Sequence, residues 1–343
     1  MYRSLPIINQ KICHMEQEYF VKQLRHIEEL LDHPAIDQSD IYRRVEKVFR
    51  EAKYFRHPYE FRFEAVYRAA SKEQETWFDN EDGRTVNVGK LHCPPDEKAI
   101  LGRCNCAGNP VFYCSSENGI PVFEVRATLN SSVVLSTWVD IKNSDYQLDQ
   151  IANYGKAAYP IIIQGVAIGV KKIIDSLPDG HQFKQLLLQD DLFKSTTPES
   201  IRKIDEYVGE LFCKSADDVK NLYWFTSAIA QILLGKMRDS NSTNGLDGFI
   251  YPSVQSKFSD FNIAFRKEFA RRQLKLLGAA MYRVVEHDPE KLSYSLKPIK
   301  GIVNDPLDDS PVWKYVHSKH SELFLLAPDV PLVDEIAYLS YED

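Results

Sequence analysis

The sequence predicts an α+β fold, because helical and strand-like patterns follow each other in blocks along its 343 residues. Amphipathic segments come first, and aromatic-rich strand segments follow from Phe61. A helical block then spans 144–240, and strand segments return at Gly248. Strands on both sides of a helical block favour one α+β domain over two independent domains. The chain is long enough to bury a substantial core.

Two amphipathic helices are expected near the start of the chain. The first spans 16–32, and the second follows Ser39-Asp40. Apolar residues recur at the spacing of helices buried on one side, namely Phe20, Leu24, Ile27 and Leu31, then Ile41, Val45, Val48 and Phe49. The pair is either a helical hairpin packed on the main domain, which is the commoner arrangement, or an element that binds a partner.

The next part of the chain predicts short strands. Residues 61–69 are rich in aromatic side chains and partly alternate, which is typical of a strand. The polar stretch 71–100 contains an expected turn at Asp82-Gly83 and a break at Pro94-Pro95. Three further strands are expected, at 110–114, 121–129 and 133–139.

The central block is expected to be helical. Its most apolar stretch, Tyr159 to Ile174, is too short to span a bilayer and favours a buried helix. Further helices are expected from Thr197-Pro198-Glu199, with proline in the first turn, and from Ser215 to Gly235. Beyond a loop expected at 239–245, strands are expected at 248–251, 262–265, 274–285 and 292–296.

Composition restricts the classes of function and the compartment. The net charge of −7 argues against a general surface for nucleic acid or for an anionic membrane, since both need a basic field. A local basic pocket remains compatible with this charge. We expect no membrane segment and no secretory signal peptide, because the first residues lack an apolar core. Six cysteines without such a signal indicate a reducing compartment, the cytoplasm.

One local run carries the most suggestive chemistry. Between Leu101 and Ser116 the chain places Arg103 and Asn105 before Gly108, and an apolar segment then leads to Tyr113. Glu124 follows in another apolar stretch. An arginine for phosphate, a ring for stacking and a carboxylate for positive charge suit a cationic dinucleotide. The alternatives are a surface salt bridge for the arginine and a half-buried strand position for the tyrosine. Glu124, as a carboxylate in an apolar stretch, must be paired or functional.

Other motifs carry less weight. Ser253 follows Pro252 after an expected strand and lacks the Gly-x-Ser-x-Gly pattern of a hydrolase nucleophile. Gly165 and Gly169 indicate close packing at most. In and around the run from Leu101 to Ser116, the residues of the types that bind metals are His92, Cys93, Cys104, Cys106 and Cys114. They include no Cys-x-x-Cys pair, so small buried thiols are expected in preference to zinc, and no metal is assigned.

Four ordered blocks together resemble the RES domain, the toxin half of bacterial RES–Xre toxin–antitoxin pairs. They are Gly102-Arg-Cys-Asn with Gly108, Pro110-Val-Phe-Tyr113, Phe123-Glu124-Val, and Asp247-Gly-Phe-Ile-Tyr-Pro-Ser253-Val followed by Asn262-Ile-Ala-Phe. Val66-Tyr-Arg68-Ala is similar to the opening strand of the family. The resemblance covers roughly residues 61–300.

The resemblance implies a fold and an activity. The fold would be a split β-sheet core like that of ADP-ribosyltransferases, with a helical insertion at 144–240. We therefore expect an N-terminal helical extension at 1–58, a catalytic domain at 59–310 and a packed C-terminal segment at 311–343. The activity would be cleavage of the nicotinamide–ribose bond of NAD, with water or inorganic phosphate as acceptor. NAD is then the substrate, and no separate cofactor is implied.

The resemblance also assigns residue roles and partners. Arg103 would hold NAD phosphate or ribose oxygens, Tyr113 would stack on nicotinamide, and Glu124 would stabilise the oxocarbenium-like transition state. Ser253 would hydrogen-bond near the same ribose, and Arg68 would contact the pyrophosphate. Asn105 and Tyr251 are further expected NAD contacts. An Xre-type helix-turn-helix antitoxin would block the site, and a homodimer is a candidate assembly.

Two other functions remain open. One is a mono-ADP-ribosyltransferase on the same fold, which would transfer ADP-ribose from NAD to a protein or nucleotide. The other is a non-enzymatic protein whose helices bind a partner and whose site is vestigial. Retention of Arg103, Tyr113, Glu124 and Ser253 argues against the vestigial site.

Overall fold

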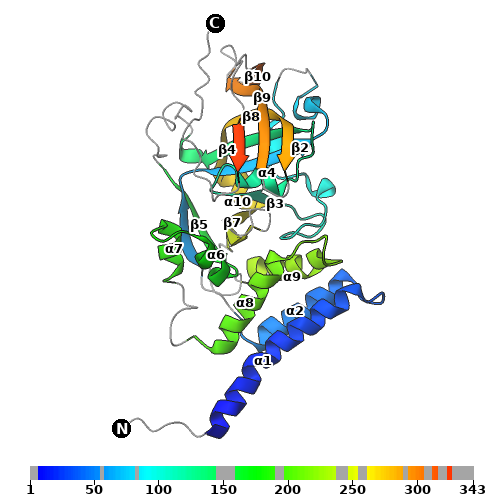
Figure 1. Cartoon of the computed structure of the whole chain (residues 1–343), viewed down its shortest axis with the longest axis vertical. Helices are drawn as coiled ribbons and strands as arrows, with labels where there is room; N and C mark the ends of the chain where they lie inside the picture. Colours follow the sequence, from blue (N-terminus) through cyan, green and yellow to red (C-terminus); the bar gives the residue numbers. More distant parts are fainter. Residues whose placement is uncertain are drawn as a thin grey trace. The chain divides into compact units, whose positions relative to one another are not determined.

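The protein combines helices with two β-sheets, which confirms a mixed architecture compatible with the expected α+β class. The computed structural model describes residues 7–54, 58–81, 85–143, 159–189, 197–236, 246–253, 261–288, 293–304, 311–315 and 323–326. Figure 1 labels the elements along the chain. Among the described helices, none is long and apolar enough to cross a membrane.

The helices differ greatly in length. The α-helices are α1 (Ile7–Glu29), α2 (Gln38–Glu51), α3 (Val88–Leu91), α4 (Ile120–Glu124), α6 (Val170–Ser176), α7 (Gln182–Leu187), α8 (Glu199–Cys213), α9 (Leu222–Lys236) and α10 (Lys267–Gln273). The 3-10 turns are η1 (Leu30–Asp32), η2 (Glu75–Phe78), η3 (Asp96–Lys98) and η4 (Ile141–Asn143).

The strands in the described residues form two sheets. They are β1 (Tyr59–Phe63), β2 (Val66–Lys72), β3 (Val111–Cys114), β4 (Ser132–Asp140), β5 (Ile161–Ala167), β6 (Gly248–Pro252), β7 (Phe261–Arg266), β8 (Leu274–Asp288), β9 (Ser293–Asn304), β10 (Pro311–Tyr315) and β11 (Leu323–Leu326). One sheet has the order β1-β5-β6-β7-β3, with β5 and β6 parallel. The other has the order β10-β9-β8-β4-β2, with β11 also paired to β9.

The chain groups into two compact units, which are described separately. The first unit comprises Met1–Tyr59, Pro95–Val111 and Gln164–Val254. The second unit comprises Glu60–Pro94, Phe112–Ile163 and Gln255–Asp343. The domain boundaries expected from the sequence resemblance stay a prediction.

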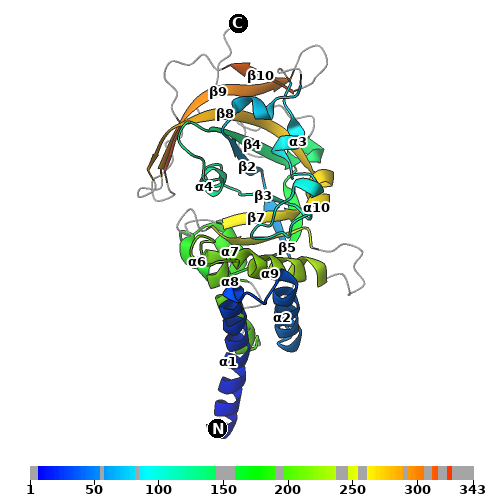
Figure 2. The same cartoon turned by 90° about the vertical axis from the view of Figure 1, so that its right-hand side faces the viewer.

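In the first unit, α1 packs against α8, and α2 packs against α9 (Figure 2). The predicted apolar faces of the N-terminal helices are confirmed, since Leu24, Ile27 and Ile41 are at most 3% exposed. Helix α2 begins at Gln38, slightly before the expected start, because the Asp37 side chain accepts a hydrogen bond from the backbone of Asp40. These helices therefore form a packed helical layer of the first unit.

In the second unit, the antiparallel sheet is held by long registers of β4 and β8 with their neighbours. Helix α4 packs against β2 and β4. Its Val122 and Phe123 join a buried cluster with Val133 and Val284 of the sheet. The sheet and this short helix thus bury one hydrophobic core between them.

The expectation of a helix over Tyr159 to Ile174 is wrong. Strand β5 occupies Ile161–Ala167, and only then does α6 begin, at Val170. A continuous apolar run fits a fully buried strand as well as a buried helix, so periodicity cannot separate them. The β-branched run Ile161-Ile162-Ile163 favours the strand. Gly169, at φ +62°, makes the turn into α6.

The expected strand over 121–129 is also wrong, because these residues begin in helix α4 and continue through a turn. Pro121 lies in the first turn of the helix, where no backbone N–H is required. Ile120, Val122 and Phe123 are all buried, in contrast to the alternation of a one-sided strand. Glu124 therefore ends a short helix and does not interrupt a strand.

Smaller differences concern the limits of elements. The expected strand over 61–69 is two strands, since β1 and β2 belong to different sheets. The helix expected from Ser215 begins at Leu222. The helix start expected at 197–199 is confirmed by α8. The strands expected at 110–114, 133–139, 248–251, 262–265, 274–285 and 292–296 are confirmed by β3, β4, β6, β7, β8 and β9, and the last two strands extend further than expected. The turn at Asp82-Gly83 and the loop at 239–245 lie outside the described residues.

Candidate functional site

The seven residues singled out by the sequence are divided between the units. Arg68, Tyr113 and Glu124 belong to the second unit. The first unit contains Arg103, Asn105, Tyr251 and Ser253. Each group is described within its own unit.

Glu124 is a half-buried carboxylate at the last position of α4. The four residues before it are buried, so the helix fixes where its side chain emerges. The amide Nδ2 of Asn262 donates a hydrogen bond of 2.7 Å to Glu124 Oε1. Hydrogen bonds to an ionised acceptor are stronger than neutral ones, so this contact holds the carboxylate in one orientation.

Asn262 is the functional candidate that sequence reasoning did not single out as a site residue. It lies on β7 between the apolar residues Phe261 and Ile263 and is 5% exposed. A buried amide requires a hydrogen-bond partner. The signal was therefore present in the sequence as an asparagine inside an apolar run. Its partner could not be named, because Glu124 is 138 positions away.

Arg68 connects three segments of the second unit. Its Nε donates to the carbonyl of Leu91 at 3.0 Å, and its Nη1 donates to the carbonyl of Tyr113 at 2.9 Å. A longer contact of 3.4 Å joins Nη2 to the carbonyl of His92. The guanidinium also lies 5.2 Å from the centre of the Phe112 ring. Burial lowers its pKa from the ordinary value. Arg68 thus fixes the backbone at Tyr113, while its expected role toward pyrophosphate stays a prediction.

Tyr113 lies on β3, between the buried side chains of Phe112 and Cys114. Its own side chain is half-buried. This agrees with the half-buried strand position considered from the sequence and leaves the ring partly accessible. Stacking on nicotinamide remains an expectation.

The thiols beside Arg68 are held in their neutral form. Burial raises the pKa of Cys93 to about 11, although the nearby Arg68 opposes the shift. The pKa of Cys114 is raised well above its ordinary value by the same cause. Cys93, Cys104, Cys106, Cys114 and Cys213 form no disulfide, and the described His, Cys, Asp and Glu residues form no group that could hold a metal ion.

In the first unit, Arg103 binds the C-terminal end of α8. Its Nη1 donates to the carbonyl of Phe212 at 2.8 Å, and its Nη2 donates to that of Lys214 at 3.1 Å. The guanidinium lies 5.6 Å from the centre of the Tyr223 ring. A cation at this end of a helix satisfies carbonyls that have no partner within the helix. The surface salt bridge considered from the sequence is therefore replaced by a helix-terminal contact.

Asn105 stabilises the loop that carries Arg103. Its Nδ2 donates to the carbonyls of Ile100 and Cys106, at 2.8 and 2.9 Å, and only 5% of the residue is exposed. Gly108 adopts φ +77°, a conformation that favours glycine. The loop geometry expected around this glycine is thus present.

Tyr251 and Ser253 are buried at the end of β6. The Tyr251 ring is 4% exposed and lies 5.6 Å from the ring of Phe212 and 5.7 Å from that of Phe249. Ser253 is 0% exposed. Within the first unit these two residues are part of the core, and their expected NAD contacts stay predictions.

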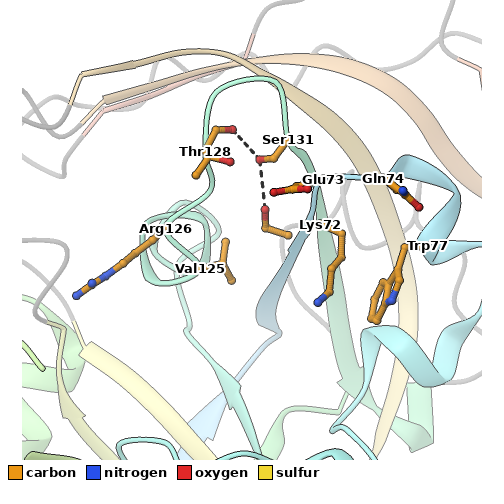
Figure 3. A pocket seen from close by; sticks show the side chains of 9 residues that line it. Lys72, Glu73, Gln74, Trp77, Val125, Arg126, Thr128 and Ser131 are labelled. Atoms are coloured by element: carbon orange, nitrogen blue, oxygen red, sulfur yellow. Dashed lines mark hydrogen bonds between the residues drawn. The ribbon is translucent and has the colours of Figure 1, made fainter. Parts of the chain in front are cut away.

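A separate pocket of about 490 Å³ lies within the second unit (Figure 3). It is formed by the end of β2, the turn η2 and the loop between α4 and β4. None of the seven residues discussed above lines it. Its lining residues are Ser71, Lys72, Glu73, Gln74, Trp77, Val125, Arg126, Thr128 and Ser131.

The fold and these contacts define a mixed α+β protein with a positioned carboxylate in its second unit. Compared with known proteins, the chain matches no family model and no curated sequence. The resemblance to the RES domain therefore rests on the sequence blocks given above.

Proposed function

We propose that the chain cleaves the nicotinamide–ribose bond of NAD, with water or inorganic phosphate as acceptor, on an ADP-ribosyltransferase-like fold of the RES type. The observation that carries this proposal is the hydrogen bond from Asn262 to Glu124. It supplies what the reaction needs most, a carboxylate with a defined orientation. The ordered sequence blocks around Arg103, Tyr113 and Ser253 support the same proposal.

The chemistry explains why one carboxylate is central. When the bond between the ring nitrogen and the ribose carbon breaks, the electron pair leaves with nicotinamide, which departs as a neutral molecule. Positive charge then develops on the ribose. A fixed carboxylate stabilises that charge more in the transition state than in the ground state, which accelerates the step. Water or phosphate oxygen then bonds to the same carbon, and with water a proton is released.

The two arginines have a double role in this proposal. Arg68 and Arg103 already donate to backbone carbonyls near Tyr113 and at the end of α8. An arginine has five N–H donors in a planar group, so it can bind carbonyls and phosphate oxygens at once. Each arginine therefore holds the backbone of its own unit, and in this proposal its remaining N–H groups can donate to phosphate oxygens.

The proposal also includes partners. An Xre-type helix-turn-helix protein would bind the chain and block NAD, as the resemblance implies, and the cytoplasm is the expected compartment. Copurification of the chain with the product of a neighbouring gene of that type is the observation that would support this part.

The test is incubation of the purified chain with NAD, with and without inorganic phosphate. We expect free nicotinamide together with ADP-ribose in water, or with phosphorylated ADP-ribose when phosphate is the acceptor. Glu124→Gln should lose this release, and Glu286→Gln, which changes an exposed carboxylate of the same unit, is its matched control. Label from NAD found on a protein or nucleotide would instead assign a mono-ADP-ribosyltransferase. Intact NAD under all conditions would overturn the enzymatic proposal.

A further inference from the structure

Two cationic residues from different segments belong to the lining of the pocket of the second unit. Figure 3 shows Lys72 and Trp77 on one side of it and Val125 and Arg126 on the other, with the Arg126 side chain extending away from Lys72. Lys72 comes from the end of β2, and Arg126 comes from the loop after α4. Glu73 is the single acidic residue of the lining, so the lining has a net positive charge although the chain as a whole has a net charge of −7.

Lys72 is held by an aromatic ring. Its Nζ lies 4.9 Å from the centre of the Trp77 ring, and this ring is 37% exposed. Among the described residues, no carboxylate forms an ion pair with Lys72. A cation–π contact orients an ammonium group without neutralising its charge. Lys72 is thus a positioned cation at the pocket wall.

The backbone of Arg126 has a conformation that residues other than glycine rarely adopt. It follows α4 with φ +46°, in the left-handed region where helix ends usually carry glycine. A side chain kept at such a position has a cost in free energy, and strained residues cluster at sites that bind ligands. The pocket lining thus includes a backbone position of the strained kind that occurs at ligand sites.

Hydroxyl groups of the pocket lining come from the loop between α4 and β4 and from β2. Ser131 Oγ donates to the carbonyl of Thr128 at 2.7 Å and lies 3.4 Å from Ser71 Oγ. The backbone of this loop pairs with Val284 of β8 through the N–H of Asn130 and the carbonyl of Ser131. The hydroxyls therefore belong to a preformed wall.

From these observations we propose that the pocket binds a phosphate-bearing small molecule of about nucleotide size. The oriented ammonium group of Lys72, the net positive charge of the lining residues and the hydroxyl groups of the lining match an anion with several acceptor oxygens. The volume of about 490 Å³ lies in the range of small-molecule sites and exceeds that of a single phosphate ion. This site goes beyond the proposed NAD cleavage, because none of its lining residues takes part in that proposal.

The first test is calorimetric titration of the full chain with AMP and with adenosine, which differ only in the phosphate group. We expect AMP to bind and adenosine to bind at least about tenfold more weakly, since charge-assisted hydrogen bonds carry the interaction. Displacement of AMP by inorganic phosphate would show that the free ion is also a ligand. Failure to displace it would restrict the site to phosphate esters. Equal affinity for AMP and adenosine would overturn the proposal.

Two substitutions locate the site. Lys72→Met keeps the apolar stem and removes the charge, and we expect AMP to bind about tenfold more weakly. Arg126→Gly removes the second cation and relieves the backbone, so AMP binding should weaken while the melting temperature is unchanged or higher. Asn130→Gly relaxes another left-handed residue of the same loop, φ +66°, without removing a cation, and is the control that should bind AMP normally.

The outcomes separate this site from NAD cleavage. Wild-type affinity for AMP in both Lys72→Met and Arg126→Gly would overturn the proposal. AMP is part of NAD, so the pocket variant separates the sites: a Lys72→Met variant that loses AMP binding but cleaves NAD at the wild-type rate would support two separate sites. A chain that binds AMP at the pocket but leaves NAD intact would disprove the proposed function and leave this inference standing.

Discussion

At the scale of single residues, the pair of Glu124 and Asn262 determines what the second unit can do. The carboxylate ends a helix, where the carbonyl end of the helix dipole gives an anion no support. The buried amide of Asn262 supplies a donor at 2.7 Å. In the proposed reaction, Asn262 is a positioning residue that acts through Glu124.

Loss of this amide should affect the rate more than substrate binding. We expect Asn262→Ala to lower kcat for nicotinamide release by about tenfold with little change in KM, because a misplaced carboxylate stabilises the transition state less well. Steady-state kinetics measure this split. Asn143→Ala is the control, since it removes another buried amide of the same unit, bonded to Tyr159. A raised KM with unchanged kcat in Asn262→Ala would contradict the positioning role.

His92 makes the free energy of unfolding of the second unit depend on pH. Burial lowers its pKa from 6.5 to about 4, and the nearby Arg68 and Arg271 act in the same direction. The ring is neutral in the folded state, which agrees with Nδ1 accepting a hydrogen bond from the Cys93 N–H at 2.7 Å. Below pH 6.5 the unfolded chain binds a proton that the folded chain excludes until about pH 4. The free energy of unfolding therefore falls as the pH decreases through this window.

This effect can be measured as a difference between melting temperatures at pH 7 and pH 5. We expect the decrease from pH 7 to pH 5 to be smaller in His92→Gln than in the wild-type chain. His26→Gln changes an exposed histidine beside Glu29 and should keep the wild-type decrease. Identical decreases in His92→Gln and wild type would show that His92 does not contribute.

At the scale of elements, two glycines set how closely α6 and α8 approach. A Cβ atom at Gly209 would lie 2.6 Å from the Cα of Gly169, a backbone atom that cannot move independently. We expect Gly209→Ala to lower the free energy of unfolding by about 1–3 kcal/mol, as overpacking does. Gly235→Ala on α9 is the matched control. Its Cβ would meet open space, and alanine should stabilise the helix by up to about 1 kcal/mol. Chemical denaturation measures the free energy of unfolding of both variants. A Gly209→Ala variant as stable as the wild type would contradict the close contact between Gly209 and Gly169.

The elements also show which patterns could be predicted. Helices α2 and α8 have one apolar face, and their positions followed from periodicity. The sequence runs of β5 and α4 begin with consecutive apolar residues, so their spacing could not separate a strand from a helix. The close approach of Gly169 was indicated by the glycine spacing, but its partner Gly209 was not, because packing between helices is not encoded locally.

At the scale of the whole molecule, both units are assembled from separated stretches of the chain. The class of fold could be predicted, since it depends on the order of the element types. The pairing of Glu124 with Asn262 could not, because it joins positions 138 residues apart. The same holds for Arg103 and α8, whose contact joins residues 109 positions apart. Long-range contacts of this kind require the three-dimensional structure.

The most direct test of the central claim is the rate of nicotinamide release from NAD by the wild-type chain and by Glu124→Gln, measured at neutral pH. The substitution keeps the shape and a hydrogen-bonding oxygen but removes the negative charge. We predict release by the wild type and a decrease of about 10²–10³-fold in kcat for the variant, the effect of losing electrostatic stabilisation of a transition state. Both proteins should unfold at similar temperatures. Equal rates in the two folded proteins, or no release by the wild type, would contradict the account.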